Sequence, residues 1–400
     1  MNGTTLLTTA LAIAGAVSLC TAGDEIPIVH NTAPAEADTA HYELEEMWRA
    51  GGFDGDLLIG YVGDALGDVQ GNTYLLDTRL YQIVVMDVDG NTVDIFGREG
   101  EGPGEFTNPG GFCWYDDGVI AVAGGRIGAL EIMDTAGNSV DTLVLSDENG
   151  DRIMLGFHGC WRMGDALVVS GNMGTGTGSS IKSEVVGTIF GRDGYRSARV
   201  LEFIHERPMY PFVYDEATSS PPWSLWDTLD GRLYVAPQRN RYMIEAYDSD
   251  GTCVSTFSRD YDSLSRTEEE IEEYEEGFRE RVAEYFPDAQ ISYMDTHTDV
   301  SRVQAGPDGN LWITSSRGGR PERDDVLRIY DVFDTTGRWL RCAELHNPTP
   351  EAKGSLIFLS GDRVLRRVLL DEDGGVHGDD TDAETENGVI CYRLSRRDAP

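Results

Sequence analysis

The chain has 400 residues, of which 70 are acidic and 32 basic, and its formal net charge at pH 7 is −38. A surface this acidic would repel the phosphates of nucleic acids and the anionic headgroups of a membrane, so the composition disfavours both as partners. Only Lys182 and Lys353 are lysines. An acidic, lysine-poor chain fits a saline habitat, and codon bias toward arginine explains it equally well.

The N-terminal residues are typical of an export signal. The segment from Leu6 to Leu19 is apolar and too short to span a bilayer. Cleavage after Ala22 would give a signal peptide over residues 1–22; alternatively, Val17-Ser-Leu-Cys20 resembles a bacterial lipobox with Cys20 as the lipidated residue. Residues 23–41 are polar and predict a flexible linker. We therefore expect an exported bacterial protein in the periplasm, anchored to the outer membrane or extracellular, without a transmembrane segment.

Two interleaved series of tight turns organise the rest of the chain. The first series opens a strand after each of six glycines, namely Gly71, Gly118, Gly164, Gly231, Gly309 and Gly361. The second joins two strands through Asp-Gly or Asp-x-x-Gly turns that end at Gly90, Gly137, Gly194, Gly251 and Gly337. Such turns between alternating apolar runs indicate hairpins. Each repeat therefore has four antiparallel strands, A to D, with short A–B and C–D turns, which is the blade of a β-propeller.

The last repeat lacks a D strand of its own. The stretch from Tyr42 to Trp48 precedes the first blade and belongs to no other blade. It would close the ring as the outer strand of the last blade, which removes two open sheet edges. The sequence therefore predicts an all-β fold, a closed six-bladed β-propeller over residues 42–396.

Three segments carry a family resemblance. Arg98-Glu-Gly-Glu-Gly-Pro-Gly-Glu-Phe106 resembles the Gly-x-Gly-Pro-Gly-Glu-Phe signature of bacterial secreted six-bladed β-propeller proteins related to NHL-repeat proteins, and Leu229–Val235 and Asp308–Ile313 match the same pattern. The resemblance covers essentially the whole mature chain and implies an exported or lipid-anchored propeller. Relatives in the wider NHL group range from protein-binding modules to metal-dependent lyases, so the resemblance implies a fold rather than a chemistry.

Insertions fall on one face of the predicted ring. The long connections are of the B–C and D–A types, at residues 98–109, 171–183, 204–222, 264–298, 315–325 and 371–388. The longest contains a helix near 265–287, which Thr267-Glu-Glu-Glu270 opens as a capping box. An apolar stripe that includes Ile271, Tyr274 and Phe278 follows and would pack on this face as a wall. Long loops on a rigid scaffold are where binding usually occurs.

Arginines interrupt the acidic background in two loops of this face. They are Arg239, Arg241, Arg317, Arg320 and Arg323. Guanidinium groups bind carboxylates and phosphates through two hydrogen bonds, so these residues are the candidate ligand-binding site. Alternatively, they pair with local acids such as Glu322, Asp324 and Asp325.

The chain offers little to support catalysis, and no catalytic residue is assigned. The histidines show no metal-binding spacing, and no nucleophile elbow is present. No cofactor is predicted, although acids near the channel mouth could hold a Ca²⁺ ion, and the metal ligands stay unknown. Cys113 and Cys160 fall in the A strands of adjacent blades, where they form either a bridge or two buried thiols.

The function that these observations favour is an exported binding module. It would be a monomer that holds a protein, peptide or glycan on the face carrying the B–C and D–A loops. The alternative is a propeller hydrolase or lyase with a divalent metal at the channel mouth. A third option is a structural part of an envelope assembly.

Overall fold

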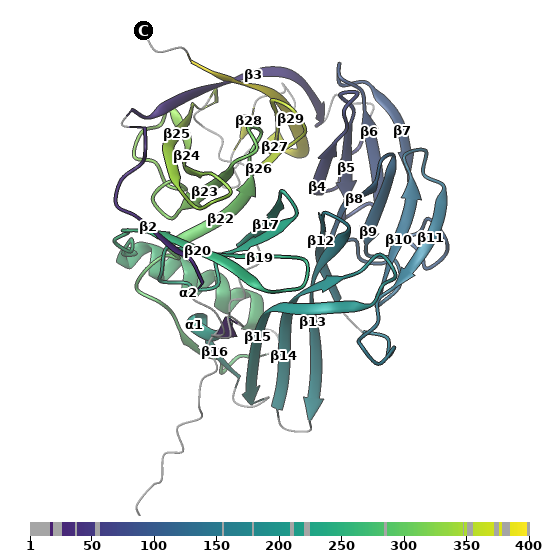
Figure 1. Ribbon diagram of the computed structural model, residues 1–400, viewed down its shortest axis with the longest axis horizontal. Helices are drawn as coiled ribbons and strands as arrows, with labels where there is room; N and C mark the ends of the chain where they lie inside the picture. Colours follow the sequence, from purple (N-terminus) through teal and green to yellow (C-terminus); the bar gives the residue numbers. More distant parts are fainter. Residues whose placement is uncertain are drawn as a thin grey trace, which may run out of the picture.

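Strands that surround a common centre make up nearly all of the regular structure (Figure 1). The computed structural model describes residues 17–18, 26–36, 38–52, 57–153, 156–177, 180–208, 212–219, 225–283, 286–346, 348–349, 355–371, 376–377 and 385–397. The strands form four-stranded antiparallel units in which neighbours along the chain are hydrogen-bonded neighbours in the sheet. This is the arrangement of a β-propeller.

Five units follow one another in chain order, and each consists of four consecutive strands. They are β4 (Val62–Gly67), β5 (Thr73–Asp77), β6 (Gln82–Met86) and β7 (Thr92–Phe96); β8 (Gly111–Asp116), β9 (Val119–Ala123), β10 (Ala129–Asp134) and β11 (Ser139–Val144); β12 (Gly156–Met163), β13 (Ala166–Thr177), β14 (Ser180–Phe190) and β15 (Arg196–Pro208); β17 (Trp226–Leu229), β18 (Arg232–Val235), β19 (Met243–Tyr247) and β20 (Cys253–Arg259); β22 (Val300–Ala305), β23 (Leu311–Ser315), β24 (Val326–Phe333) and β25 (Trp339–His346). The short strand β1 (Val17–Ser18) pairs with β15.

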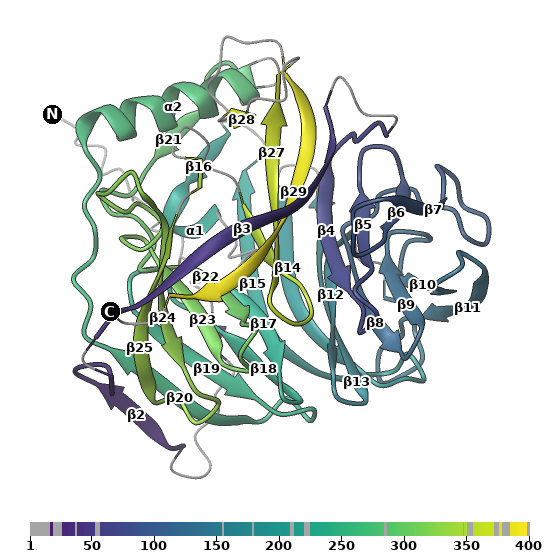
Figure 2. The same ribbon diagram turned by 90° about the horizontal axis from the view of Figure 1, so that it is seen from above.

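The last unit is completed by the N-terminal strand β3 (Ala40–Gly51). It contains β26 (Leu356–Phe358), β27 (Arg363–Leu370) and β29 (Glu386–Arg396), and β28 (Val376–His377) pairs with β27. β3 pairs antiparallel with β29 from Tyr42 opposite Arg396 to Gly51 opposite Gly388. Figure 2 shows the two strands, far apart in sequence, side by side. This is the pairing that the sequence predicts for Tyr42–Trp48.

The apolar core lies between the units. Each of the larger clusters of buried apolar residues joins two consecutive units, as in the cluster that holds Leu76 of β5 and Ile120 of β9. The same relation holds between the last unit and the first, because Trp48 and Val389 share a cluster with Leu75 and Val84. The middle strands are therefore buried on both faces, whereas an outer strand such as β7 is mostly exposed.

One contact recurs between units and includes β3. The glycine of a C–D turn packs under the last strand of the preceding unit: a Cβ added to Gly137 would lie 2.5 Å from Cβ of Phe96, and one added to Gly337 would lie 2.6 Å from Cβ of Phe257. Gly90 stands in the same relation to Trp48 of β3, at 2.5 Å. β3 therefore contacts the first unit as an ordinary outer strand would.

This contact predicts the effect of Gly90→Ala. The new methyl would meet the Trp48 ring, and Gly90 has a positive φ of 85°, so both clash and backbone strain are expected. Gly118 is the matched control, because its φ is 69° and no atom of the described residues lies within 4 Å of an added Cβ. In urea unfolding, Gly118→Ala should lower the free energy of unfolding by about 1–2 kcal/mol, and Gly90→Ala should lower it by about 1–3 kcal/mol more than that. Equal costs would mean that Trp48 does not pack there.

The Asp residues that open the C–D turns explain why these turns are so regular. Asp87 Oδ1 accepts hydrogen bonds from the backbone N–H groups of Asp89 (3.0 Å) and Asn91 (2.8 Å). Asp134 does the same for Ala136 and Asn138. The pKa of Asp87 is lowered, first by the bond from the Asn91 side chain, because these donors favour the charged carboxylate. The hairpin interpretation of Asp87–Asn91 agrees with this geometry.

Two sequence predictions about loops are wrong. The region predicted as a flexible linker contains β2 (Ile28–Asn31), which pairs parallel with β20, and Ala35 N–H bonds to the carbonyl of Trp339 at 2.9 Å. The stretch 171–183, predicted as a loop, continues β13 and β14, whose pairing extends to Thr177 opposite Ser180. In both places an open strand edge supplies backbone partners, and these partners do not depend on side-chain pattern.

The helical insertion is confirmed and forms a small subdomain. α2 (Glu268–Ala283) begins with the predicted capping box, in which Thr267 Oγ1 accepts from the N–H of Glu270 at 3.1 Å and Glu270 Oε2 accepts from the N–H of Thr267 at 2.8 Å. Tyr274 and Phe278 pack on Phe212 and Tyr214, beside the paired strands β16 (Val213–Asp215) and β21 (Gln290–Ser292). The short helix α1 (Glu216–Ser219) follows β16.

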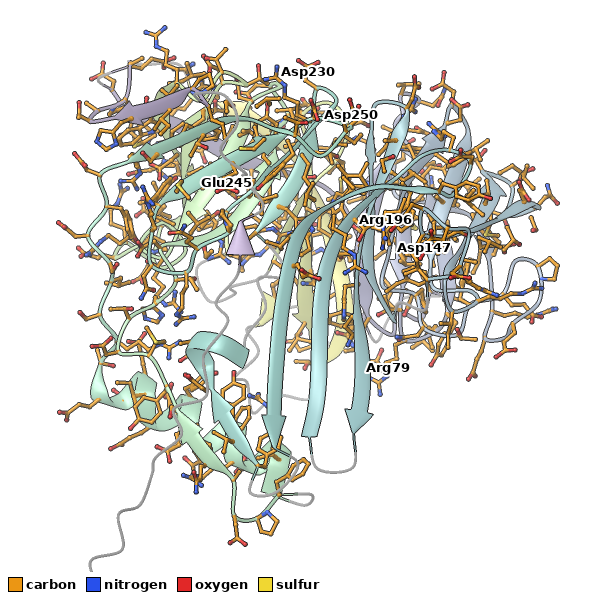
Figure 3. The ribbon with its side chains drawn as sticks, turned by 60° about the horizontal axis from the view of Figure 1, so that its bottom comes forward. Arg79, Asp147, Arg196, Asp230, Glu245 and Asp250 are labelled. Atoms are coloured by element: carbon orange, nitrogen blue, oxygen red, sulfur yellow. The ribbon has the colours of Figure 1, made fainter. Side chains whose placement is uncertain are left out.

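The two faces of the molecule differ as the sequence predicts. Asp230 and Asp250, which belong to tight turns of the β17–β20 unit, lie at the end opposite α2 (Figure 3). Figure 2 likewise shows α2 at the end of the molecule opposite β18 and β19. Among the described residues, no helix is both long and apolar enough to cross a membrane.

Candidate functional site

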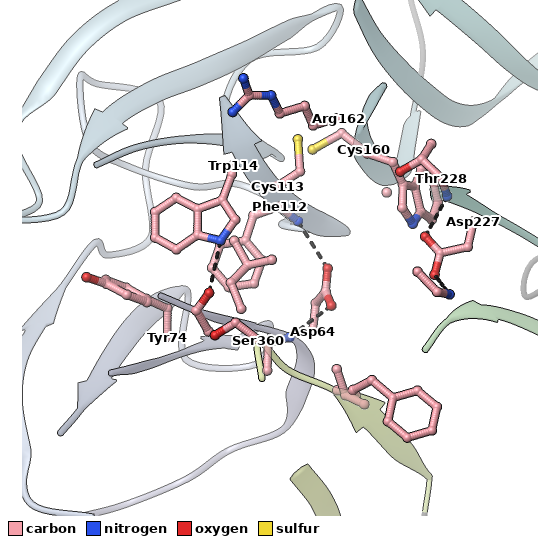
Figure 4. Close-up of a pocket in the computed structure, with 18 of the residues that line it drawn as sticks. Asp64, Tyr74, Phe112, Cys113, Trp114, Cys160, Arg162, Asp227, Thr228 and Ser360 are labelled. Carbon is pink, nitrogen blue, oxygen red and sulfur yellow. Dashed lines mark hydrogen bonds between the residues drawn. The ribbon is translucent and has the colours of Figure 1, made fainter. Parts of the chain in front are cut away.

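A cavity of about 1260 Å³ runs along the first strands of the units (Figure 4). Its walls come from β4, β8, β12, β17, β22 and β26, so it is the central channel of the propeller. Residues of the tight A–B turns also line it, including Asp68, Asp117 and Gly164. The cavity therefore extends to the tight-turn face. Neither α2 nor any of the five predicted arginines lines it.

Two half-buried aspartates occupy related positions in this channel. Asp64 of β4 accepts hydrogen bonds from the N–H groups of Ala65 (2.9 Å) and Phe112 of the next unit (3.3 Å). Asp227 of β17 likewise accepts from Thr228 (2.7 Å) and from Ala305 of the next unit (2.8 Å). The first strand of each unit is a sheet edge, so its free N–H groups need such acceptors.

Burial changes the charge state of both carboxyls. It raises the pKa of Asp64 to about 6, against an ordinary value of 3.8, although two backbone N–H groups oppose the shift. Burial also raises the pKa of Asp227. Asp64 therefore has an appreciable neutral population in weak acid, where it can donate as well as accept a hydrogen bond.

Arg302 of β22 lies near enough to both carboxyls to lower their pKa values through its charge. It lines the cavity, and within the described part of the chain its guanidinium makes no hydrogen bond or ion pair. Burial lowers its pKa, and the charges of Asp227 and Asp64 only partly offset that loss of hydration. Five N–H donors in a half-buried channel are costly to leave without acceptors. This arrangement is suited to an incoming anion.

Aromatic rings supply the apolar part of the wall. Trp114 Nε1 donates to the carbonyl of Gly67 at 3.2 Å, and its ring stands edge-on to Tyr74 with centroids 5.4 Å apart. Trp161 and Trp226 form a second edge-to-face pair at 6.0 Å. Both pairs line the same cavity. The channel thus combines flat apolar surfaces with a few charged groups, as ligand-binding cavities commonly do.

Cys113 and Cys160 meet at the wall of the channel. Their sulfur atoms point toward each other in Figure 4. Both are free and buried, and Cys160 Sγ donates to the carbonyl of Ala121 at 3.4 Å. The neighbouring Cys113 thiol and then burial raise the pKa of Cys160, so the thiol rather than the reactive thiolate is favoured. Of the two alternatives from the sequence, the structure has the pair of thiols.

The predicted arginines lie in loops near α2, and several have acidic partners. Arg239 bonds to Glu216 at 2.9 Å, and Arg323 bonds to both carboxylate oxygens of Asp325 at 2.6 and 3.0 Å. Arg320 lies 3.9 Å from Glu270. Arg317 donates to the carbonyl of Asp262 at 3.2 Å, and Arg241 is exposed. These contacts favour the pairing with local acids that the sequence left open.

Glu216 explains why arginines gather there. It is 3% exposed and accepts bonds from Arg239, from Arg266 through both oxygens (each 2.7 Å), and from the N–H of Met294 at 2.9 Å. Burial alone would raise the pKa of Glu216, but the Arg266 bond and the other donors lower it overall. The network joins α1 to the segments on either side of α2, which is a structural role.

Sequence reasoning missed the channel residues. Asp64, Asp227 and Arg302 stand in the first strands of three different units, and a charged residue at the same place in several repeats was the available signal. These three residues are distant in sequence, and only closure of the ring brings their strands to one channel.

Asp64 gives a prediction for pH dependence. Its folded-state pKa of about 6 exceeds the ordinary 3.8, so its contribution to stability is fully present below about pH 4 and is lost as the pH rises through 6. Asp64→Asn stays neutral throughout. The variant should match the wild type near pH 4 and be more stable by about 2–3 kcal/mol at pH 7.

Urea unfolding at a series of pH values checks this result. Asp87→Asn is the control, and its effect on stability should have the opposite sign. The pKa of exposed Asp87 is lowered in the folded protein, so removal of its charge should destabilise the fold only above about pH 4. An Asp64 variant that gains nothing at neutral pH would contradict the burial of that charge.

Comparisons with known proteins concern the fold. No protein-family model and no curated protein sequence matches the chain, so the relation to NHL-repeat proteins stays a prediction. One similar solved structure is a protein of Bacteroides fragilis NCTC 9343 described as exported, with 11% identity over 93% of this chain and 99% of that one and a TM-score of 0.47. A second is a DUF4221 member from Bacteroides vulgatus, with 9% identity over 89% of this chain and 99% of that one and a TM-score of 0.47. A third is a catalytically inactive virginiamycin B lyase from Staphylococcus aureus solved with quinupristin, with 11% identity over 88% of this chain and 99% of that one and a TM-score of 0.41. The strand pairings, rather than these distant similarities, identify the chain as a β-propeller with a polar central channel.

Proposed function

We propose that the chain is an exported binding module that holds a carboxylate-bearing glycan or peptide in its central channel. The observation that carries this proposal is Arg302, a half-buried guanidinium without a partner among the described residues. A ligand carboxylate would accept hydrogen bonds from two N–H groups of Arg302. The Trp114 and Trp161 rings would cover the apolar faces of the ligand, and Asp64 and Asp227 would accept from its hydroxyl or amide groups.

The proposed entrance is on the tight-turn face. Asp68 and Asp117, from the A–B turns of the first two units, stand at that end of the cavity. A cavity of about 1260 Å³ has room for a short oligosaccharide or a few peptide residues. The site thus differs in place from the loop-face site expected from the insertions, whereas the class of function stays the same.

The scaffold for this function is a closed ring of six blades in a monomer. Support for closure comes from the β3–β29 pairing and from the apolar cluster that joins Trp48 and Val389 to the first unit. Export rests on the apolar Leu6–Leu19 segment, most of which lies outside the described residues, as does Cys20. Labelled palmitate incorporated only when Cys20 is present would identify a lipoprotein, and a cytoplasmic chain with Met1 intact would refute export.

The loop face remains a second candidate for anion binding. Arg320 supports it, because burial lowers its pKa while its Glu270 contact is long at 3.9 Å. Arg239, Arg317 and Arg323 would contribute only by exchanging the partners described above, whereas Arg241 is exposed and could contribute directly. Arg320→Ala separates the two places, since a ligand in the channel would not respond to it.

Asp64 supports the alternative of a hydrolase or lyase. A carboxyl with a pKa of about 6 in a channel has the proton affinity of a general acid or base at neutral pH. The metal expected at the channel mouth is not supported by a ligand cluster there among the described residues. The enzyme would be established if the wild type converts a bound ligand and the Asp64→Asn variant still binds that ligand but no longer converts it.

The experiment that tests the binding module is a screen of the purified chain. Acidic glycans and peptides should be compared with matched neutral forms in which the carboxylate is an amide. We expect binders only among the acids, as measured by calorimetry. Asn91→Ala, in a C–D turn, should leave binding unchanged. Binders that prefer the neutral forms would argue against an anion site in the channel.

A further inference from the structure

Two histidines and a glutamate meet where the N-terminal strand begins its path across the molecule. β3 first pairs parallel with β25, which places His41 directly opposite Glu344. His346 lies two residues beyond Glu344, and alternate residues of a strand share a face. The three side chains therefore converge on one point, although His41 and His346 are 305 positions apart.

Their donor atoms have the spacing of metal ligands. His41 Nδ1 lies 3.2 Å from His346 Nε2 and 3.3 Å from Glu344 Oε2. All three donor atoms lie within 4.8 Å of one another. In a tetrahedral Zn²⁺ site with bonds of about 2.0–2.1 Å, neighbouring ligand atoms are about 3.3 Å apart. The two measured separations therefore need little adjustment to accept the ion.

The surroundings fit a metal site that is held from one side and open on the other. His346 is 8% exposed, whereas the His41 side chain is 42% exposed and leaves access for an ion and a water ligand. Asp325 Oδ2 lies 3.6 Å from His346 Nδ1, the nitrogen that would not bind the ion. A carboxylate in this position commonly orients a metal-binding imidazole.

Arg323 is the group that an ion must displace. Its Nη1 lies 3.1 Å from Glu344 Oε2, the same oxygen that faces His41. The Arg323 side chain is 54% exposed and stays bonded to Asp325, so it can release Glu344 at little cost. Its positive charge nevertheless opposes a cation at this point.

We propose that His41, Glu344 and His346 form a Zn²⁺ site that fastens β3 to β25. Imidazole and carboxylate donors in this number suit Zn²⁺, with water as the fourth ligand. The ion would link the N-terminal strand to the unit before the one it completes. Its role is structural, and it is independent of the ligand proposed for the channel.

Calorimetric titration of the tag-free chain with Zn²⁺ alone tests this site. We expect one ion per chain, and at least about a hundredfold loss of affinity in His41→Ala and in His346→Ala, because even a residue that only orients a ligand is typically worth ten- to a hundredfold. His30→Ala is the matched control. His30 also faces a carboxylate, Asp260 at 3.2 Å, but among the described residues it belongs to no cluster of three potential metal ligands.

Two further results distinguish a metal site from a chance pair of histidines. Arg323→Ala should bind Zn²⁺ more tightly than the wild type, since the competing cation is gone. Excess Zn²⁺ should raise the melting temperature of the wild type but not of the double variant His41→Ala/His346→Ala. Circular dichroism shows whether each variant is folded. Zn²⁺ binding that survives in the folded double variant, or no binding by the wild type, would overturn the proposal.

Discussion

Replacing Arg302 with methionine is expected to weaken ligand binding strongly while leaving the protein as stable as before, or more stable. Methionine keeps the length of the side chain and removes a charge that is poorly hydrated and has no partner in the described structure. Removing such a charge should raise the unfolding free energy by about 1 kcal/mol or more. Loss of a charge-assisted bidentate contact should weaken binding at least tenfold, and roughly a hundredfold if about 3 kcal/mol is lost.

Arg341→Met is the matched control. Arg341 is likewise shielded from solvent, but it bonds to Asp308 at 2.5 Å and lies 3.5 Å from Glu36. Its loss should destabilise the fold by roughly 1.5–3 kcal/mol and leave binding to the folded protein unchanged. Urea unfolding and calorimetry on both variants give the comparison. An Arg302 variant that is destabilised as much as the Arg341 variant would mean that Arg302 has a structural partner.

Replacing Trp48 with alanine is expected to destabilise the whole ring. Trp48 is 6% exposed and packs between the last unit and the first, where it shares a cluster with Leu75 and Val389. Truncating a buried tryptophan costs about 3–5 kcal/mol. Because the cluster closes the ring, we expect a single cooperative unfolding transition at a lower urea concentration, with an unchanged slope.

The control for this prediction is Val93→Ala on the outer strand β7. Val93 is 62% exposed, and its truncation should change stability by no more than about 0.5 kcal/mol. A Trp48 variant within that range would show that the N-terminal strand is an accessory arm. A second, separate transition would show that the last unit unfolds apart from the others.

The parts of the fold that the sequence predicts depend on local chemistry. The Asp87 and Asp134 turns form because one carboxylate accepts two nearby N–H groups, and the Thr267–Glu270 box forms in the same short-range way. The place of β3 was predictable for a different reason. The last repeat lacks a strand, and the N-terminal end of the chain has a strand that belongs to no repeat. Pairing the two removes open sheet edges, which folded proteins avoid.

The parts that the sequence did not predict depend on which distant segments meet. The extension of β13 and β14 needs a neighbouring strand edge, and residues 171–183 carry no apolar alternation that would announce it. The His41–His346 pair depends on the parallel pairing of β3 with β25. The strand Val300–Ala305 also lacks the regular apolar alternation that would show which way the Arg302 side chain faces.

The most direct test of the channel site is a cycle that changes Arg302 and the ligand carboxylate together. An acid from the screen and its neutral amide would be titrated into the wild type and into Arg302→Met. If the guanidinium binds the carboxylate, the wild type prefers the acid and the variant does not, with a coupling energy of about 1.5–3 kcal/mol. Equal preference for the acid in both proteins would contradict the proposed site.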